Sequence, residues 1–430
     1  MGLLSYFNTR NIKALGDRRH RPKALNFLVN KIDSKLGNET AHSFPYIASM
    51  NITNICNLRC RFCEIHYFYK KAKDIAGKVF PNHLNVETLK RHKRWLKRII
   101  TIELSGANGE PFASPDIAGV ITYLKELGIR LTATTNGQLI DEAMARHLIE
   151  SRFDSLLFSV HAGDRETYAK LQGGDFDAFL SRLESLISLR RQLNSQYPKT
   201  SMNFALNREN AAGIKALMKR ARDIGIDSFM VNHYYDCRNA LKKDISFYFN
   251  VAECNTLLKD AYAYADELGL KMEPPSPPYL TGMTEPDTEE RVAGRCEAPW
   301  TTIKFKGCVE YDSCEYICVC NRIILFRIDY NRFYANGKAD FLRHIWNSGV
   351  LKYLRKTVNS PQGNPICRFC RDADTPRIRC LDNVEYSRRR DRAIVDFFRD
   401  FRNSGYPQED VDGLTLLNEN PYKYDERDGF

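Results

Sequence analysis

The sequence contains no run of apolar residues long enough to cross a bilayer, so it predicts no membrane-spanning helix. Its first six residues do not predict a signal peptide, because their short apolar patch is followed by polar and basic sequence. They also lack the Ser or Thr that the myristoylation pattern requires where Tyr6 stands. The absence of these signals predicts a cytoplasmic protein without a membrane partner.

An excess of acidic residues is also missing. Lys and Arg number 64 against 53 Asp and Glu, which gives a formal net charge of +11. This balance would suit nucleic acid, an anionic substrate or an acidic partner, and much of it lies in residues 10–23 and Lys90–Arg98. The basic stretches lack the interleaved aromatic residues expected for strand binding. We therefore interpret them as a solvated basic face and do not expect nucleic acid as a partner.

Alternating apolar and amphipathic segments occupy the chain from Tyr46 to about Asp236. The expected strands are Tyr46–Thr53, Ile99–Ser105, Arg130–Thr135, Ser155–Val160, Ser201–Leu206 and Ser228–Asn232. The expected helices are Glu87–Lys97, Pro115–Leu127, Asp141–Glu150, Phe179–Leu193 and Ala211–Ile224. Repeats of this kind predict an α/β fold with a parallel sheet, curled or doubly wound. Chemistry in such sheets gathers at the carboxyl ends of the strands.

The length of 430 residues predicts two or three domains. Composition divides the chain into a basic N-terminal extension at 1–45, a core at 46–236, a helical connector with a proline-rich linker at 237–290, a cysteine-rich α+β domain at 291–385, and a charged C-terminal tail at 386–430. The extension reads as irregular apart from an amphipathic stretch near Ala24–Ile32.

Thirteen cysteines in a chain without an export signal argue against a disulfide framework. Clustered thiols in a reducing compartment are more often metal ligands or catalysts. Three cysteines lie within 56–63, five between 296 and 320, and a pair follows at Cys367 and Cys370. Two metal sites are therefore expected.

The first cluster, Cys56, Cys60 and Cys63, forms a C-x3-C-x2-C run just past the first expected strand. Four thiolates would saturate a cubane iron–sulfur cluster, whereas three leave one iron open. An open coordination position distinguishes a reactive metal site from a structural one. A structural zinc site completed by His66 is the alternative.

This run, with Phe62 before its last cysteine, resembles the signature of the radical S-adenosylmethionine (SAM) superfamily. The resemblance implies a partial (βα)6 barrel and a [4Fe-4S] cluster whose open iron is chelated by SAM. Reduction would cleave SAM to methionine and a 5′-deoxyadenosyl radical, which removes a hydrogen atom from the substrate. It also implies a reductant such as flavodoxin or ferredoxin.

Further motifs follow in the order that the resemblance requires. Gly109 and Glu110 resemble the segment that binds the amino group of SAM, and Asn136 lies in a turn that the family often carries after its third strand. Ser159 stands where relatives approach the ribose, and Asn203 resembles the fifth-strand region. We expect these five residues to bind the cofactor.

Three positions depart from the family pattern. Asn108 replaces the first glycine of the segment before Glu110, and His161 stands where relatives often carry an acidic residue. Gln172 stands where relatives often have arginine, which puts a charge contact from this position to the SAM carboxylate in doubt.

The second cluster begins with Cys296, which opens a predicted β-hairpin, and continues with Cys318 and Cys320 on its return strand. Cys367-Arg-Phe-Cys370 completes the unit. Four thiolates from a hairpin and a C-x2-C knuckle would make a closed site suited to zinc or to an iron–sulfur cluster. The residues alone slightly favour zinc.

In combination with the upstream core, this pattern resembles the SPASM or shorter twitch extension, which carries auxiliary [4Fe-4S] clusters. The Cys-x2-Pro-Trp opening and the Ile345-Trp346-Asn347 run before Cys-x2-C are typical of it. The full SPASM ending needs more cysteines after Cys370, and only Cys380 follows. The resemblance therefore implies one auxiliary cluster, on Cys296, one of Cys318 or Cys320, Cys367 and Cys370. Cys314 competes as the middle ligand.

Candidates for direct contact with the substrate follow the sixth expected strand. Cys237 could donate a hydrogen atom to a substrate radical, and Asp236 or His233 could take a proton. The alternative is that Cys237 is a small buried hydrophobic residue. Cys308 and Cys314 are rival hydrogen donors on the hairpin.

Two functions from different classes remain. The first is a radical SAM enzyme acting on a small-molecule or peptide substrate by dehydrogenation, epimerisation or bond formation. The second is a non-catalytic zinc-binding protein whose basic face binds RNA.

Overall fold

The computed structural model describes residues 20–63, 65, 69, 73, 78, 82–105, 109–234, 245, 247, 250–273, 295–307, 314–320, 323–329, 332, 341–373, 383–408 and 414–417. The strands within these residues are β1 (Ile47–Asn51), β2 (Thr101–Ser105), β3 (Arg130–Thr135), β4 (Ser155–Ser159), β5 (Lys199–Leu206), β6 (Ser228–His233), β7 (Met272–Glu273), β8 (Thr302–Gly307), β9 (Cys314–Cys318), β10 (Phe326–Asp329) and β11 (Leu414–Leu416). They form one sheet in the order β11-β10-β9-β8-β1-β2-β3-β4-β5-β6-β7.

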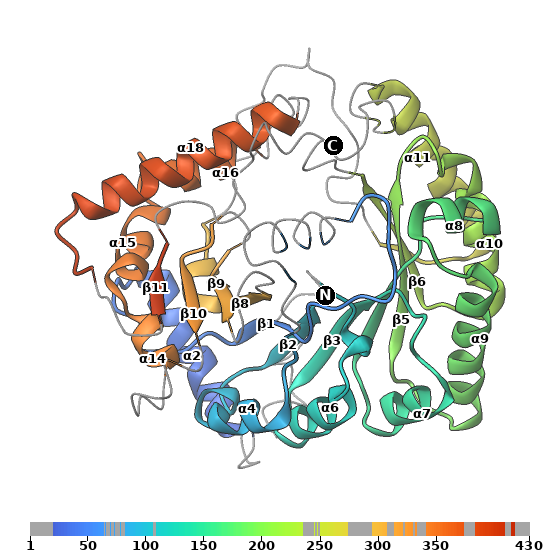
Figure 1. Cartoon of the computed structure of the whole chain (residues 1–430), viewed down its shortest axis with the longest axis horizontal. Helices are drawn as coiled ribbons and strands as arrows, with labels where there is room; N and C mark the ends of the chain where they lie inside the picture. The colour runs from blue at the N-terminus through green and yellow to red at the C-terminus, as the bar shows by residue number, and fades with distance from the viewer. Residues whose placement is uncertain are drawn as a thin grey trace.

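Strands β1 to β7 pair in parallel, as the βα repeats predict. On the other edge of β1, β8 also pairs in parallel, with Ile47 opposite Thr302. Strands β9, β10 and β11 continue the sheet in antiparallel pairs. The cysteine-rich part of the chain therefore extends the sheet of the core, and in Figure 1 the whole sheet lies inside a ring of helices.

The α-helices are α2 (Arg21–Leu36), α4 (Val86–Arg91), α5 (Lys93–Leu96), α6 (Ile117–Glu126), α7 (Glu142–Glu150), α8 (Arg165–Gln172), α9 (Phe176–Gln192), α10 (Ile214–Ile224), α11 (Val251–Leu268), α12 (Ala298–Thr301), α14 (Phe341–Trp346), α15 (Gly349–Val358), α16 (Pro365–Ala373) and α18 (Asn383–Arg402). The described residues also form two 3-10 turns, η3 (Pro111–Ala113) and η4 (Ala211–Gly213). No helix in the described part of the chain is both long and apolar enough to cross a membrane.

Alternation along the strands separates the two faces of the sheet. In β3, Leu131, Ala133 and Thr135 are buried toward the helices, whereas Thr132 and Thr134 are only partly covered on the inner face. Successive strand side chains point to opposite faces, so the polar set lines the interior while the apolar set packs under the helices. The inner face is therefore the polar surface on which a site can form.

The α/β class is confirmed, and the six expected strands agree with β1–β6 to within a few residues. The helix expected at Glu87–Lys97 is interrupted at His92, and α8 is present where none was expected. The connecting helix expected after residue 250 is α11.

A charged C-terminal tail is expected at 386–430, and the described part of this segment is folded. Helix α18 buries Ile394, Phe397, Phe398 and Phe401, which recur at the spacing of one helix face. Strand β11 pairs with β10 beyond it. The charged residues that precede and flank the phenylalanines dominate the composition of this segment, so its apolar face is not evident from composition.

Candidate functional site

The first cysteine cluster lies in the loop that follows β1. The backbone N–H of Leu58 donates to Cys56 Sγ at 3.4 Å, and the N–H of Cys63 donates to the Cys60 carbonyl at 3.1 Å. Each thiol is close enough to disfavour ionisation of its neighbours. The loop therefore brings all three predicted ligands to one place.

Burial is the main influence on these thiols. It raises the pKa of Cys56 to about 11 and raises the pKa of Cys60 still further, with the neighbouring thiols acting in the same direction. A buried thiolate needs a compensating positive charge, and a bound metal supplies one. The three sulfur donors and the N–H donated to Cys56 suit an iron–sulfur cluster. Across the described residues, no group of three or more His, Cys, Asp or Glu side chains is arranged to hold a single metal ion.

The segment that follows β2, which contains Gly109 and Glu110, packs directly against the cysteine loop. A Cβ atom at Gly109 would lie 2.2 Å from the Thr53 carbonyl oxygen, so the close approach requires glycine. The next residue, Glu110, donates its backbone N–H to the Ile55 carbonyl at 2.8 Å. The predicted SAM-binding segment and the cysteine loop thus form one unit.

The Glu110 carboxylate is buried and accepts three hydrogen bonds. Its donors are Thr135 Oγ1 at 2.6 Å, the Asn136 backbone N–H at 2.8 Å and the Phe112 backbone N–H at 3.2 Å. Burial raises the pKa of Glu110 to about 7, against the opposite effect of these bonds. Oε1 takes two donors and Oε2 takes one, so Oε2 keeps a free acceptor position.

Asn136 connects β3 to the cysteine loop. Its side-chain Nδ2 donates to Asn57 Oδ1 at 2.8 Å and lies 3.9 Å from Cys56 Sγ. A continuous chain of contacts therefore runs from Glu110 through Asn136 to Cys56.

Ser159 ends β4, and Asn203 lies within β5. They are register partners on the partly exposed inner face of the sheet. Asn203 Oδ1 also accepts a hydrogen bond from Asn232 Nδ2 at 2.6 Å. These two predicted cofactor-binding residues are therefore neighbours. In the sheet order, their strands β4 and β5 are two and three positions away from β2, the strand that precedes Glu110.

The side-chain amide of Gln172 bonds the backbone at the end of β4, a role that the sequence does not reveal. It is fully buried, accepts the His161 backbone N–H at 2.7 Å and donates to the Ser159 carbonyl at 3.0 Å. Both ends of its amide are therefore engaged in holding the end of β4 to α8.

His161 is buried in a neutral form beside the cysteine loop. Its Nδ1 accepts the Ala205 backbone N–H at 3.0 Å, so the neutral ring carries its proton on Nε2. Burial lowers the pKa of His161 to about 4. Its ring centroid lies 5.3 Å from that of Phe62, which in turn lies 5.5 Å from that of Tyr234. Three rings thus gather next to Cys63.

The second cysteine group is held by two asparagines around the α15–α16 turn. Asn359 accepts the Cys296 backbone N–H at 3.0 Å and donates to the Cys296 carbonyl at 3.1 Å. Asn364 accepts the Cys367 backbone N–H at 2.9 Å, as an N-cap of α16 does. The two cysteines are thereby fixed to the same turn.

Electrostatic contacts separate the two candidates for the middle ligand. Burial raises the pKa of Cys367 to about 12, and Cys320, Cys296 and Cys370 all act on it in the same direction. Burial raises the pKa of Cys318 to about 11, but there Lys306 and Lys304 act in the opposite direction. Cys320, and not Cys318, thus acts on the Cys367 thiol together with Cys296 and Cys370. The Cys318 thiol is influenced by the two lysines and by Cys320.

Several sequence-predicted residues lie outside the described part of the chain, namely His66, Asn108, Asp236, Cys237, Cys308 and Cys380. His233 ends β6 and Cys314 begins β9, but neither side chain is described. Sequence reasoning missed Asn359 and Asn364. The Asn364-Pro365 pair is a recognisable helix start, whereas Asn359 carries no local signal because Cys296 is 63 residues away.

Comparison with known families places a radical SAM match on this part of the chain. Residues 50–221 match the radical SAM superfamily, a range that begins in β1 and ends in α10. The match includes the cysteine loop, Glu110, Asn136, Ser159 and Asn203.

Two curated relatives align over a similar length. A stretch of 169 residues, 39% of this chain, is 32% identical to Fe-coproporphyrin III synthase of Methanosarcina barkeri and spans 38% of that protein. A stretch of 183 residues, 41% of this chain, is 27% identical to a probable GTP 3′,8-cyclase of Saccharolobus islandicus and spans 53% of it. The aligned regions thus cover less than two thirds of either relative.

Among solved structures, Streptococcus suis SuiB bound to precursor peptide SuiA superposes with a TM-score of 0.49 at 20% identity. The superposition covers 69% of this chain and 63% of that one.

Proposed function

Because residues 50–221 form a radical SAM domain, we propose that this protein holds a [4Fe-4S] cluster on Cys56, Cys60 and Cys63 and uses it to cleave SAM reductively. When bound, the cluster and SAM together supply a 5′-deoxyadenosyl radical, which abstracts a hydrogen atom from a small-molecule or peptide substrate. The products would arise by dehydrogenation, epimerisation or bond formation.

The contact chain from Glu110 through Asn136 to Cys56 carries this proposal. Asn136 brings an N–H dipole toward the Cys56 sulfur, which favours its thiolate form. Glu110 fixes the start of the Asn136 turn and retains an acceptor position on Oε2 for the amino group of SAM. Ligand positioning and SAM recognition would therefore depend on the same buried carboxylate.

The aromatic group next to Cys63 would shield the reactive end of the site. Phe62, His161 and Tyr234 present apolar ring surface from the cysteine loop, β4 and β6. Exclusion of water protects a reactive intermediate from side reactions. Ser159 and Asn203, on the adjacent inner face, would bind the ribose side of SAM.

We further propose that Cys296, Cys320, Cys367 and Cys370 hold an auxiliary [4Fe-4S] cluster in a SPASM- or twitch-like region. The mutual effect of these thiols on the ionisation of Cys367 and the Asn359–Asn364 turn support it. A closed set of four thiolates would saturate the cluster and suit it to electron transfer. A flavodoxin- or ferredoxin-like carrier would supply electrons.

An acidic group on the substrate would suit the inner face. Lys304 and Lys306 are two residues apart on β8, so their side chains lie on the same face of the sheet. Lys304 is the register partner of Ser49 on β1, so Ser49 lies on that face too. The names of the two curated relatives refer to small molecules, Fe-coproporphyrin III and GTP, which supports a small molecule over a peptide. His233, which ends β6, and Asp236, which follows in the sequence, remain proposed proton acceptors, and Cys237 remains a proposed hydrogen-atom donor.

Anaerobic purification tests the proposal directly. The protein should contain iron and sulfide, absorb broadly in the visible, and release 5′-deoxyadenosine from SAM when a reductant is added. Cys56→Ala, Cys60→Ala and Cys63→Ala should each abolish this release, because an open-iron cluster needs all three ligands. Cys254→Ala, at a buried cysteine of α11 far along the chain, is the matched control.

Two outcomes would reject the proposal. If the triad variants release 5′-deoxyadenosine at the wild-type rate, the cluster lies elsewhere. If the protein is colourless and contains only zinc, the non-catalytic zinc-binding alternative is correct, and RNA retention on the basic face becomes the next measurement.

A further inference from the structure

Helix α2 is oriented opposite to an ordinary surface helix. Its polar side chains Lys23, Asn26, Asn30, Asp33 and Ser34 are buried. Its large aliphatic side chains face outward, with exposed fractions of 54% for Leu25, 54% for Leu28, 36% for Val29, 55% for Ile32 and 71% for Leu36. A surface helix normally turns its apolar side to the core, so this outward aliphatic stripe requires its own explanation.

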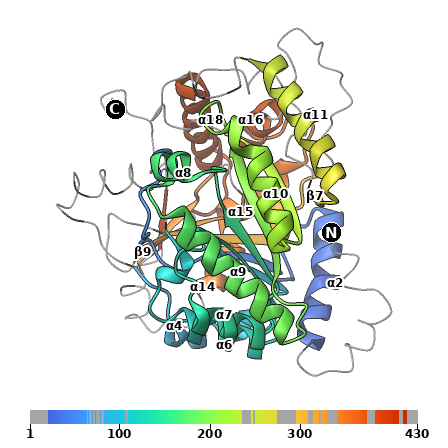
Figure 2. The same ribbon diagram turned by 90° about the vertical axis from the view of Figure 1, so that its right-hand side faces the viewer.

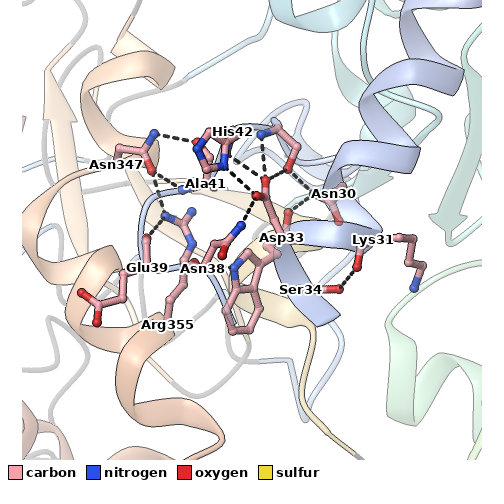
Figure 3. A network of polar contacts seen from close by, with 12 residues as sticks. Asn30, Lys31, Asp33, Ser34, Asn38, Glu39, Ala41, His42, Asn347 and Arg355 are labelled. Atoms are coloured by element: carbon pink, nitrogen blue, oxygen red, sulfur yellow. Dashed lines mark hydrogen bonds and ion pairs between the residues drawn. The ribbon is translucent and has the colours of Figure 1, made fainter. Parts of the chain in front are cut away.

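Specific hydrogen bonds fix the orientation of the helix. Asp33 accepts from Asn38, His42 and Ser43, with distances from 2.7 to 3.0 Å. Asn30 donates to Ser43 Oγ and to the carbonyl of Trp300, as the close view of this region shows in part (Figure 3). Rotating the helix to bury the leucines would leave these polar groups without partners.

A third anchor lies at the start of the helix. Lys23 Nζ donates to the Ile99 carbonyl at 2.5 Å, and Asn26 Nδ2 donates to the Phe44 carbonyl at 3.0 Å. With Asn30 and Asp33, these contacts hold three successive turns. The stripe is therefore a fixed feature of the folded protein.

Both exposed charged residues of α2 are basic. They are Arg21 and Lys35, whereas the acidic residue of the helix, Asp33, is buried. Lys31 is half-exposed and forms an ion pair with Glu297. The stripe therefore has a basic residue near each of its ends.

We propose that α2 docks on the surface of a membrane that contains anionic lipid. The helix lies at one edge of the described elements in Figure 2. Aliphatic side chains enter the boundary between headgroups and acyl chains, while adjacent Lys and Arg side chains bind anionic headgroups. A helix that lies on a membrane needs one apolar face, so the absence of a spanning segment does not bear on it. This proposal replaces our sequence-based expectation of no membrane partner.

Charge and composition favour lipid over a second copy of the chain. Two α2 helices packed face to face would bring Arg21 and Lys35 of both copies together with no exposed acidic residue on either helix. The stripe also contains only Leu, Val and Ile, whereas the centres of protein interfaces are enriched in Tyr, Trp and Arg. Anionic lipid satisfies the apolar stripe and the basic residues near its ends at once.

Flotation with vesicles tests the proposal on the full chain. Wild-type protein should float with phosphatidylcholine vesicles that contain about one third phosphatidylglycerol, and flotation should fall steeply with added salt or with phosphatidylcholine alone. The double variant Leu28→Asp with Ile32→Asp should reduce flotation at least about tenfold, because both side chains leave water on binding. Lys35→Glu should weaken it to a smaller extent.

A matched control is Val395→Asp, which places the same charge on an exposed aliphatic position of α18 and should leave flotation unchanged. Thermal melting of each variant should match wild type, because all three changed side chains of α2 point outward. Failure of the wild type to float with the anionic vesicles would overturn the proposal. Light scattering that shows a wild-type dimer, reduced to monomer by the double variant without any flotation, would assign the stripe to a second copy instead.

Discussion

Cys318 and Cys320 are two residues apart, but their surroundings give them different roles. Lys304 and Lys306 act on the Cys318 thiol, whereas Cys320 acts on Cys367 within the second cysteine group. We expect Cys320→Ala to lose the iron of the auxiliary cluster, about four atoms per chain, and Cys318→Ala to keep it. Iron and sulfide analysis of anaerobically purified protein measures the difference.

Cys318→Ala is the internal control, since it removes a thiol from the same hairpin. The reverse result, iron loss with Cys318→Ala alone, would assign Cys318 as the ligand. Zinc in place of iron in both variants would show that the second group is a structural zinc site.

Site residues can be proposed from sequence where the chemistry depends on local spacing. Cys56, Cys60 and Cys63 are such a case, because one loop holds all three, and their role as ligands stays a prediction. The middle ligand of the second group could not be chosen, because the choice depends on how the hairpin lies against α16. The position of Gln172 was identified, but its engagement with Ser159 and His161 depends on how α8 packs against β4.

At the scale of elements, α2 carries an unusual buried cation. Lys23 is fully buried, and burial lowers its pKa from 10.5 to about 7. Between these two values the folded protein binds fewer protons than the unfolded chain, so its stability should rise with pH across this window. Below the lower value the full penalty of burying the charge remains. We expect an effect on the order of a few kcal/mol, measured as the free energy of unfolding against pH.

Lys23→Met should remove this pH dependence, because the methionine side chain carries no proton to lose. Lys35→Met, at an exposed position of the same helix, should leave the pH dependence as in the wild type. The unfolding free energy of the wild type is compared with that of Lys23→Met at each pH. If this difference stays level or falls from neutral to alkaline pH, the assignment is contradicted.

Element boundaries were predictable where periodicity is simple. β3 occupies the expected residues Arg130–Thr135, because alternation and the flanking turns agree. α18 was missed because the arginines and aspartates around its phenylalanines dominate the composition of the segment. The inward polar face of α2 could not be read from the sequence, since the same amphipathic pattern fits a helix packed either way round.

At the scale of the whole molecule, the N-terminal helix and the cysteine-rich region are attached to the core by the same contacts. β8 pairs with β1 within the continuous sheet. Lys31 of α2 forms an ion pair with Glu297 at 2.5 Å, and Trp346 Nε1 donates to the Ser43 carbonyl at 2.8 Å. These links predict that core and cysteine-rich region unfold as one cooperative unit, although they were expected as separate domains.

Substitution of Arg355 can test whether the core and the cysteine-rich region unfold as one cooperative unit. Arg355 is buried and donates to the Glu39 carbonyl and to Asn347 Oδ1, each at 3.1 Å (Figure 3). It also donates to the Pro299 carbonyl at 3.1 Å and lies 4.8 Å from the centroid of the Trp346 ring. Burial lowers its pKa to about 9, and the charge of the Asp33 carboxylate acts in the opposite direction. The guanidinium therefore binds α15 to the loop after α2 and to the segment that follows Cys296.

Arg355→Met should leave these acceptors without their donor, at a cost on the order of a few kcal/mol. Calorimetry of the wild type should show one transition, and the variant should show one transition at lower temperature. Hydrogen exchange should accelerate together in β1 and β8, because the two strands share their backbone pairing. Thr357→Ala, on the same helix, serves as a milder control, since its hydroxyl bonds only within the α15–α16 region. Two separate transitions in the wild type, or faster exchange confined to α15, would show that the two regions fold independently despite the continuous sheet.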